Sequence, residues 1–181
     1  MIRTIVAFIF IFISGLTYGQ SNLAIKKEIP TVNFELPKGI EWDLVMDVPP
    51  EPGNKGVLMF KHKPIELSCA DCKVEPIIAV LYESISDSID AVEYSVNYIG
   101  TKPYQLVHKL IGGFPDYSGD QHSVVFDVTY VREEVEHSVL LAYIVCNDIG
   151  IEIICDTITE AFPKVEQQMR DFIRNFSADE Y

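Results

Sequence analysis

The order of apolar and polar positions along the chain predicts mostly β-strands. Val32, Phe34 and Leu36 alternate with polar neighbours, which is typical of a strand with one buried face. Later apolar runs predict further strands over residues 40–48, 57–62, 77–82, 104–111, 122–131, 135–145 and 149–158. The last four follow one another through short turn segments, so we expect them to form an antiparallel meander.

In two segments the apolar residues recur about every 3.6 positions instead of every second position, and this spacing predicts two helices. The first follows from apolar residues at spacings of four and three: Ile85, Ile89, Val92, Val96 and Ile99. These would share one face, with Ser86 or Asp87 as N-cap and Gly100 in the left-handed position after the end. The second follows from Phe162, Val165, Met169, Phe172 and Phe176, with Pro163 in its first turn.

The predicted order is therefore hairpins, a helix, a four-strand meander and a C-terminal helix. Short connections dominate, so the expected fold class is α+β, an antiparallel β-sheet with helices packed on it.

Three segments give this pattern a resemblance to a known family. They are the tryptophan-bearing early strand in residues 36–42, the strand in residues 76–80 before a helix, and the closing helix in residues 172–176. Together they resemble the PsbP-like α/β/α sandwich of photosystem II extrinsic proteins and bacterial secreted proteins, over roughly residues 29–177. The resemblance implies an accessory or binding module. It brings no catalytic motif and no binding residue.

The first nineteen residues read as a secretory signal peptide. Arg3 supplies a positive n-region and residues 5–13 an apolar run, shorter than the roughly 20 residues that span a bilayer. Small residues then define a cleavage site between Gly19 and Gln20. We therefore expect a secreted or periplasmic protein.

Removal of residues 1–19 would leave one domain and two short ends. Residues 20–28 are polar and are expected to be flexible, residues 29–177 form the domain, and residues 178–181 are an acidic tail. The remaining chain carries 13 basic against 27 acidic residues, a net charge of −14. Such a surface repels nucleic acid and anionic membranes, whereas cationic ligands or basic protein faces would suit it.

The four cysteines are the most distinctive reactive residues of the sequence. Cys69 and Cys72 lie before a strand rather than at a helix N-terminus, so a structural disulfide in an oxidising compartment is the leading interpretation. A redox-active pair or a metal site remains an alternative. Cys146 and Cys155 lie on successive strands, and a tight turn that places Cys146 near Ile151 would set them too far apart to bridge. Their pairing stays open.

An acidic turn is a weak candidate for a metal site. Glu133, Glu134 and Glu136 supply oxygen ligands and His137 an imidazole, although charged residues in turns usually face water. The sequence contains no Gly-x-Ser-x-Gly nucleophile elbow, and no cofactor motif is recognised.

The leading hypothesis is a secreted, non-catalytic binding or accessory module that acts on a protein partner or small ligand. One alternative is a small secreted enzyme whose site assembles only in the fold. Another is a thiol-redox or metal-binding protein that uses Cys69 and Cys72.

Overall fold

The structure is a computed structural model that describes residues 32–33, 41–51, 53–69, 71–86, 88–111, 123–146 and 148–178. Within these ranges, side chains are described except at residues 32–33, 106–111 and 177–178. The predicted signal peptide, its cleavage site at Gly19 and Gln20, and the predicted flexible segment 20–28 lie outside the described residues.

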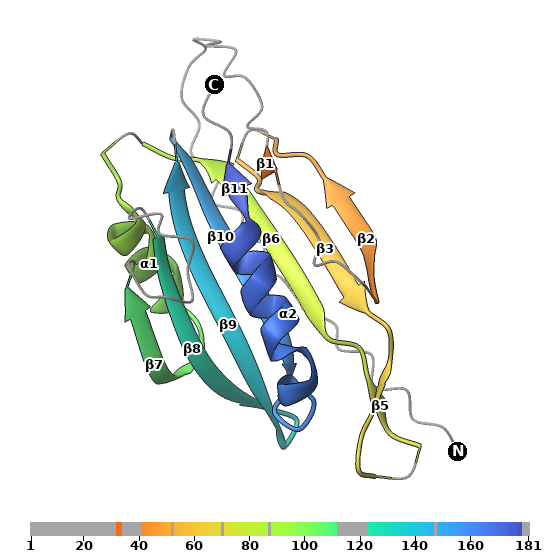
Figure 1. The fold of residues 1–181 in the computed structure, drawn as a ribbon. Helices are drawn as coiled ribbons and strands as arrows, with labels where there is room; N and C mark the ends of the chain where they lie inside the picture. Colours follow the sequence, from red (N-terminus) through yellow and green to blue (C-terminus); the bar gives the residue numbers. More distant parts are fainter. Residues whose placement is uncertain are drawn as a thin grey trace.

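A seven-stranded antiparallel sheet forms the centre of the described chain (Figure 1). Its strands, in spatial order, are β2 (Trp42–Val48), β3 (Gly56–His62), β6 (Ile77–Ser84), β10 (Ile149–Ile158), β9 (Val135–Cys146), β8 (Ser123–Arg132) and β7 (Gln105–Ile111). The meander from β7 to β10 is as predicted. The α+β fold class is therefore confirmed.

Two short strand pairs lie beside this sheet. β1 (Val32–Asn33) pairs with β11 (Ser177–Ala178), which brings the early chain to the end of the last helix. β11 thus includes the first residue of the predicted acidic tail. β4 (Ile65–Glu66) pairs with β5 (Lys73–Val74) in a hairpin that extends beyond the main sheet (Figure 1).

The two helices pack on opposite faces of the sheet. α1 (Ala91–Ile99) contacts β8 and β9, and its buried Ala91 and Tyr94 join an apolar cluster with strand residues that include Val124, Phe126 and Leu141. α2 (Phe162–Asn175) covers the other face and joins a cluster with residues of β3, β6, β9 and β10. Strand residues alternate between these two clusters, because successive side chains of a strand point to opposite faces.

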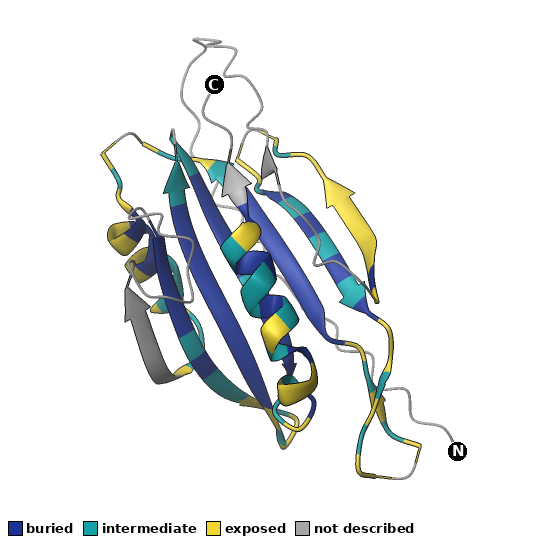
Figure 2. Cartoon of the chain, in the orientation of Figure 1, coloured by how far each residue is buried: buried dark blue, intermediate teal, exposed yellow. Residues whose placement is uncertain are grey.

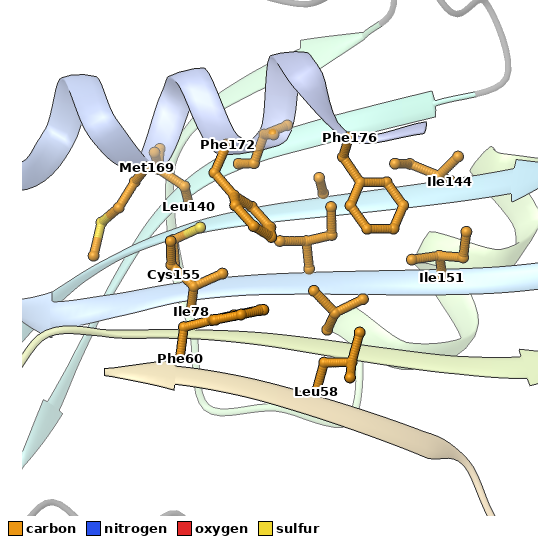
Figure 3. Packing of buried hydrophobic residues seen from close by; sticks show 14 of the residues in the cluster. Leu58, Phe60, Ile78, Leu140, Ile144, Ile151, Cys155, Met169, Phe172 and Phe176 are labelled. Atoms are coloured by element: carbon orange, nitrogen blue, oxygen red, sulfur yellow. The ribbon is translucent and has the colours of Figure 1, made fainter. Parts of the chain in front are cut away.

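The larger cluster lies beneath α2 (Figure 3). Phe172 is fully buried and its ring centroid lies 5.7 Å from that of Phe60 on β3 and 6.2 Å from that of Phe176. Met169 is buried in the same cluster one turn earlier. The predicted apolar face of this helix is therefore the one that packs.

Helix α1 begins later in the chain than predicted and buries a different face. It begins after Asp90, whose side chain accepts a hydrogen bond from the backbone N–H of Glu93, rather than after Ser86 or Asp87. Gly100 has a right-handed φ of −66°, not the left-handed conformation expected. Ile85 and Ile89 precede the helix, so the apolar repeat that includes them predicts the wrong buried face.

The consequence is that a different face of α1 is buried. Val92 and Val96, predicted as core, are 47% and 63% exposed, whereas Ala91, Tyr94 and Ser95 are buried. Tyrosines rather than valines therefore join this helix to the sheet.

The hairpin between β9 and β10 is tighter than predicted. Cys146 pairs in register with Ile149, which leaves two residues between the strands, and Ile151 pairs with Ile144. Cys155 lies opposite Leu140, six residues from Cys146 along β9, or about 20 Å at the rise of a strand. No disulfide joins Cys146 and Cys155.

Candidate functional site

The acidic turn predicted as a weak metal candidate does not bring its side chains together. Glu133 and Glu134 form a two-residue hairpin turn with φ values of 50° and 65°, and both are exposed. Glu136 is exposed on β9, while the neighbouring His137 points to the opposite face and is buried. Among the residues that the structure describes, no group of three or more His, Cys, Asp or Glu could hold a metal ion.

His137 instead belongs to a buried polar group on the same sheet face as α1. Its Nδ1 lies 2.9 Å from Asp156 Oδ1, and the hydroxyl of Tyr130 donates to Asp156 Oδ2 at 2.7 Å. The rings of Tyr130 and His137 stack with centroids 4.7 Å apart. These residues come from β8, β9 and β10, which are consecutive strands of the sheet.

A histidine held by a carboxylate is an arrangement that general-base catalysis uses. In the described part of the chain, however, no hydroxyl or thiol has a hydrogen bond to His137 Nε2 that would make it a nucleophile. The hydroxyl of Tyr130 lies 3.3 Å from the other ring nitrogen, Nδ1. Burial first, and then the charge of Asp156, raises the pKa of Tyr130, so this tyrosine remains a hydrogen-bond donor.

Glu83, near the end of β6, is the centre of a second polar group. Its Oε1 accepts hydrogen bonds from Tyr94 at 3.0 Å and Tyr98 at 2.5 Å, and lies 2.9 Å from Lys55 Nζ. The ammonium of Lys55 also sits 3.6 Å from the centre of the Tyr98 ring. A carboxylate, an ammonium and two phenols therefore satisfy one another.

Glu152, in the middle of β10, forms the third group and is almost fully buried at 2% exposure. Its Oε1 accepts a hydrogen bond from Tyr143 at 2.9 Å and forms an ion pair with Lys102. Lys102 follows α1 in the chain, so this ion pair ties the segment after the helix to the sheet. A buried carboxylate without such partners would be strongly destabilising.

The tyrosines of these groups are poor acids in the folded protein. Burial is the main cause that raises the pKa of Tyr94, Tyr98, Tyr104 and Tyr143, and the nearby carboxylates add to it. The negative charge of Glu152 acts on all four, so the groups around Glu83 and Glu152 are electrostatically continuous. We call them together the tyrosine–carboxylate network. Its side chains donate to and neutralise one another.

A glycine makes room for this network. Gly150 lies opposite Glu83 in the sheet, and a Cβ added there would come within 2.5 Å of the Tyr94 ring. Any larger residue at position 150 would therefore displace the tyrosine that holds Glu83.

The apolar pattern of the sequence does not predict this network, although some signals of it are present. Glu83 is the one acidic residue of the mostly apolar β6, Glu152 lies between apolar residues of β10, and Tyr94 and Tyr98 are spaced i, i+4 on the helix. An isolated charge in a buried strand indicates a partner, but nothing local identifies which residue that partner is.

Replacing Lys102 by methionine is expected to lower the free energy of unfolding by about 2–3 kcal/mol, because the buried Glu152 would lose its cationic partner. The expected loss is smaller than for a fully buried ion pair, because the side chain of Lys102 is 24% exposed. Urea denaturation would measure the loss. The double variant Lys102→Met/Glu152→Gln should recover most of it.

Lys73→Met is the matched control. Lys73 also pairs with a glutamate, Glu66, but both side chains are more than half exposed. Its loss should stay within about 0.5 kcal/mol. Equal losses in Lys102→Met and Lys73→Met would contradict the role assigned to Glu152.

Cys69 and Cys72 lie at disulfide distance, with Cα atoms 5.5 Å apart, in the loop between β4 and β5. The backbone N–H of Ser68 donates to Glu160 at 2.6 Å, and Lys164 donates to the carbonyl of Glu66 at 2.7 Å. The bridge thus closes a loop that is fastened to the start of α2, in keeping with a structural role.

Among the described residues, the largest group of exposed apolar side chains lies at the sheet edge formed by β2 (Figure 2). Of its seven residues only Trp42 is buried. Its exposed apolar side chains are between 41% and 50% accessible: Leu44, Val45, Met46 and Val48. With the exposed Asp43 and Asp47, these six residues define what we call the β2 edge surface. Elsewhere in the described chain, large apolar side chains are exposed only at Val92, Val96 and Val131.

Comparison with known proteins identifies the fold but no family. No family model matches the chain, and no curated protein matches it. Among solved structures it is similar to PA94 from Pseudomonas aeruginosa, a protein of unknown function, with a TM-score of 0.55, 10% identity, and coverage of 78% of this chain and 99% of that one. It is also similar to LpqN of Mycobacterium tuberculosis, involved in cell envelope biogenesis, with a TM-score of 0.55, 12% identity, and coverage of 83% and 84%.

These similarities establish a shared α+β fold with one protein of unknown function and one associated with the cell envelope. For the described residues, the structure contains no helix long and apolar enough to cross a membrane.

Proposed function

We propose that the chain is a secreted accessory module of the cell envelope that works by binding a protein partner rather than by catalysis. The observation that carries this proposal is the state of the tyrosine–carboxylate network. Glu83 and Glu152 already accept hydrogen bonds from tyrosines and pair with lysines. In the separate polar group on the same face, Asp156 is held by Tyr130 and His137. Carboxylates engaged in this way stabilise a fold, whereas a catalytic carboxylate needs a substrate proton within reach.

The exposed β2 edge surface supports the binding part of the proposal. Contiguous exposed apolar residues on a folded domain commonly mark a site of interaction with another molecule. In this chain they lie at a sheet edge that neither helix covers (Figure 1).

Two further features support the envelope location. The N-terminal nineteen residues carry the pattern of a signal peptide. LpqN, which has a similar fold, is associated with cell envelope biogenesis. We also propose membership of the PsbP-like group, supported by the arrangement of one helix on each face of an antiparallel sheet.

Crosslinking and affinity capture from the native envelope would test this function. We expect the recovered chain to begin at Gln20 and to be crosslinked to a distinct protein partner, in amounts that survive washing at physiological salt. A chain that retains residues 1–19, or that is recovered without a partner in repeated captures, would contradict the proposal. A Glu152→Gln variant serves as the control, because it alters the network but leaves β2 unchanged.

A further inference from the structure

We propose that β2 is the docking strand of this module and that it binds an extended, basic segment of its partner as an eighth strand of the sheet. The inference rests on the proposed function and deepens it, since it names the surface and the chemistry of the partner. The relevant features of β2 are its edge position among the described strands, its anchoring and its charge.

β2 offers the geometry that strand addition needs. It is the first strand in the spatial order, so its outer side has no strand neighbour in the seven-stranded sheet. The backbone groups of such an edge can pair with an added strand, while side chains on both faces make the specific contacts. Here Leu44 and Met46 supply exposed apolar contacts on the two faces of β2.

The strand is held in place before any partner binds. Trp42 at its start is buried, and its indole N–H donates to Gln168 of α2 at 2.7 Å. The Trp42 ring also contacts His62 edge to face at a centroid distance of 5.0 Å. β2 pairs with β3 along its length, apart from a register shift between Leu44 and Met46. A preformed strand lowers the entropic cost of binding.

The charge of this edge favours a basic partner. Asp43 and Asp47 are exposed within the strand, and within the described residues neither forms an ion pair. Lys61, which lies opposite Asp43, is held by Glu75 at 3.0 Å. The carboxylates of β2 are therefore available to lysine or arginine side chains of an added strand.

The same charges argue against a second copy of this chain as the occupant. If two copies paired through β2, the exposed Asp43 and Asp47 of one copy would lie near those of the other. Each chain also carries a net charge of −13, so the copies repel one another. Like charges opposite each other destabilise a strand pair. An extended segment that alternates apolar and basic residues does not meet this repulsion.

The direct test measures binding of a synthetic seven-residue peptide that alternates lysine and valine. We expect it to bind the protein at low salt, and to slow amide hydrogen exchange in β2. A peptide that alternates glutamate and valine should not bind, and nor should the lysine peptide with alternate backbone nitrogens methylated, because methylation removes the pairing N–H groups.

Charge reversal at the edge provides the decisive variant. Asp43→Lys/Asp47→Lys should weaken binding of the lysine peptide about tenfold or more. Glu93→Lys/Glu136→Lys changes the net charge equally at exposed positions on α1 and β9, and should leave binding within about twofold. Equal binding to both double variants, slowed exchange at another element, or no binding to the unsubstituted protein would overturn the proposal. So would a stable dimer through β2 in sedimentation experiments.

Envelope capture with the same variants separates this inference from the proposed function. If Asp43→Lys/Asp47→Lys recovers the same partner as the unsubstituted protein, β2 is not the docking strand and the accessory function stands. If neither protein recovers a partner, both proposals fail. Loss of the partner from the β2 variant alone supports the docking strand.

Discussion

Raising the pH from 9 to 11 is expected to lower the free energy of unfolding by at least about 3 kcal/mol. The fully buried Tyr94 and Tyr143 cause most of this effect, because burial raises the pKa of both above the usual value near 10. In the unfolded chain these tyrosines lose their protons near pH 10. Between that pH and the folded pKa, the folded state therefore binds more protons.

This difference in bound protons determines the direction in which stability changes with pH. When the folded state binds more protons, stability falls as the pH rises. It is fully present below pH 10 and is lost progressively above it, at up to about 1.4 kcal/mol per pH unit for each fully buried tyrosine. Tyr98, Tyr104 and Tyr130 act in the same direction, but they are only partly buried and contribute less.

Urea denaturation at a series of pH values would measure the loss, with phenolate absorbance near 295 nm recorded in parallel. We expect phenolate to form together with unfolding. The slope of the unfolding free energy against pH reports how many protons are released on unfolding at high pH. Tyr143→Phe should lower that number by about one, whereas Val92→Ala, a variant outside the network, should leave it unchanged. Phenolate formation at pH 11 in a chain that remains folded would contradict the burial assigned to these tyrosines.

The arrangement of strands could be predicted because its signals are local. Apolar alternation marks each strand, and short turns such as Glu133-Glu134 force neighbouring strands to pair antiparallel. The second helix was predicted with its correct face, since Val165, Met169 and Phe172 repeat within the helix itself. For α1 the apolar repeat begins before the start of the helix, so the face that it predicts is wrong.

The tyrosine–carboxylate network could not be predicted because it depends on contacts between distant parts of the chain. Glu83 becomes a neighbour of Tyr94 only because Gly150 of β10 lies opposite it and leaves space for the ring. Lys102 reaches Glu152 across fifty positions of sequence. Periodicity describes which face a residue takes, but it contains no information on which strand will lie alongside.

The β2 edge surface was hidden for a related reason. Leu44, Met46 and Val48 were predicted within a strand, and apolar strand residues are usually assigned to the core. Whether they are buried depends on the place of the strand in the sheet and on the reach of the helices. β2 lies at the edge of the sheet, and after Trp42, which contacts α2, its side chains remain exposed.

Phe172→Ala is expected to lower the free energy of unfolding by about 3–5 kcal/mol, as large-to-small substitutions of buried aromatic residues do. The Phe172 side chain is fully buried between Phe60 and Phe176, and its removal would leave a cavity beneath α2. Equilibrium denaturation in urea would measure the change.

Val96→Ala is the informative comparison, because the apolar periodicity assigns Val96 to the core as it does Phe172. In the structure Val96 is 63% exposed, so its substitution should change stability by no more than about 0.5 kcal/mol. If Val96→Ala lowered the free energy of unfolding by several kcal/mol, the face of α1 predicted from the sequence would be the buried one. That result would contradict the buried position of Tyr94. Phe60 belongs to β3, the strand that pairs with β2. The Phe172→Ala cavity should therefore also speed amide exchange in the proposed docking strand, whereas Val96→Ala should leave that exchange unchanged.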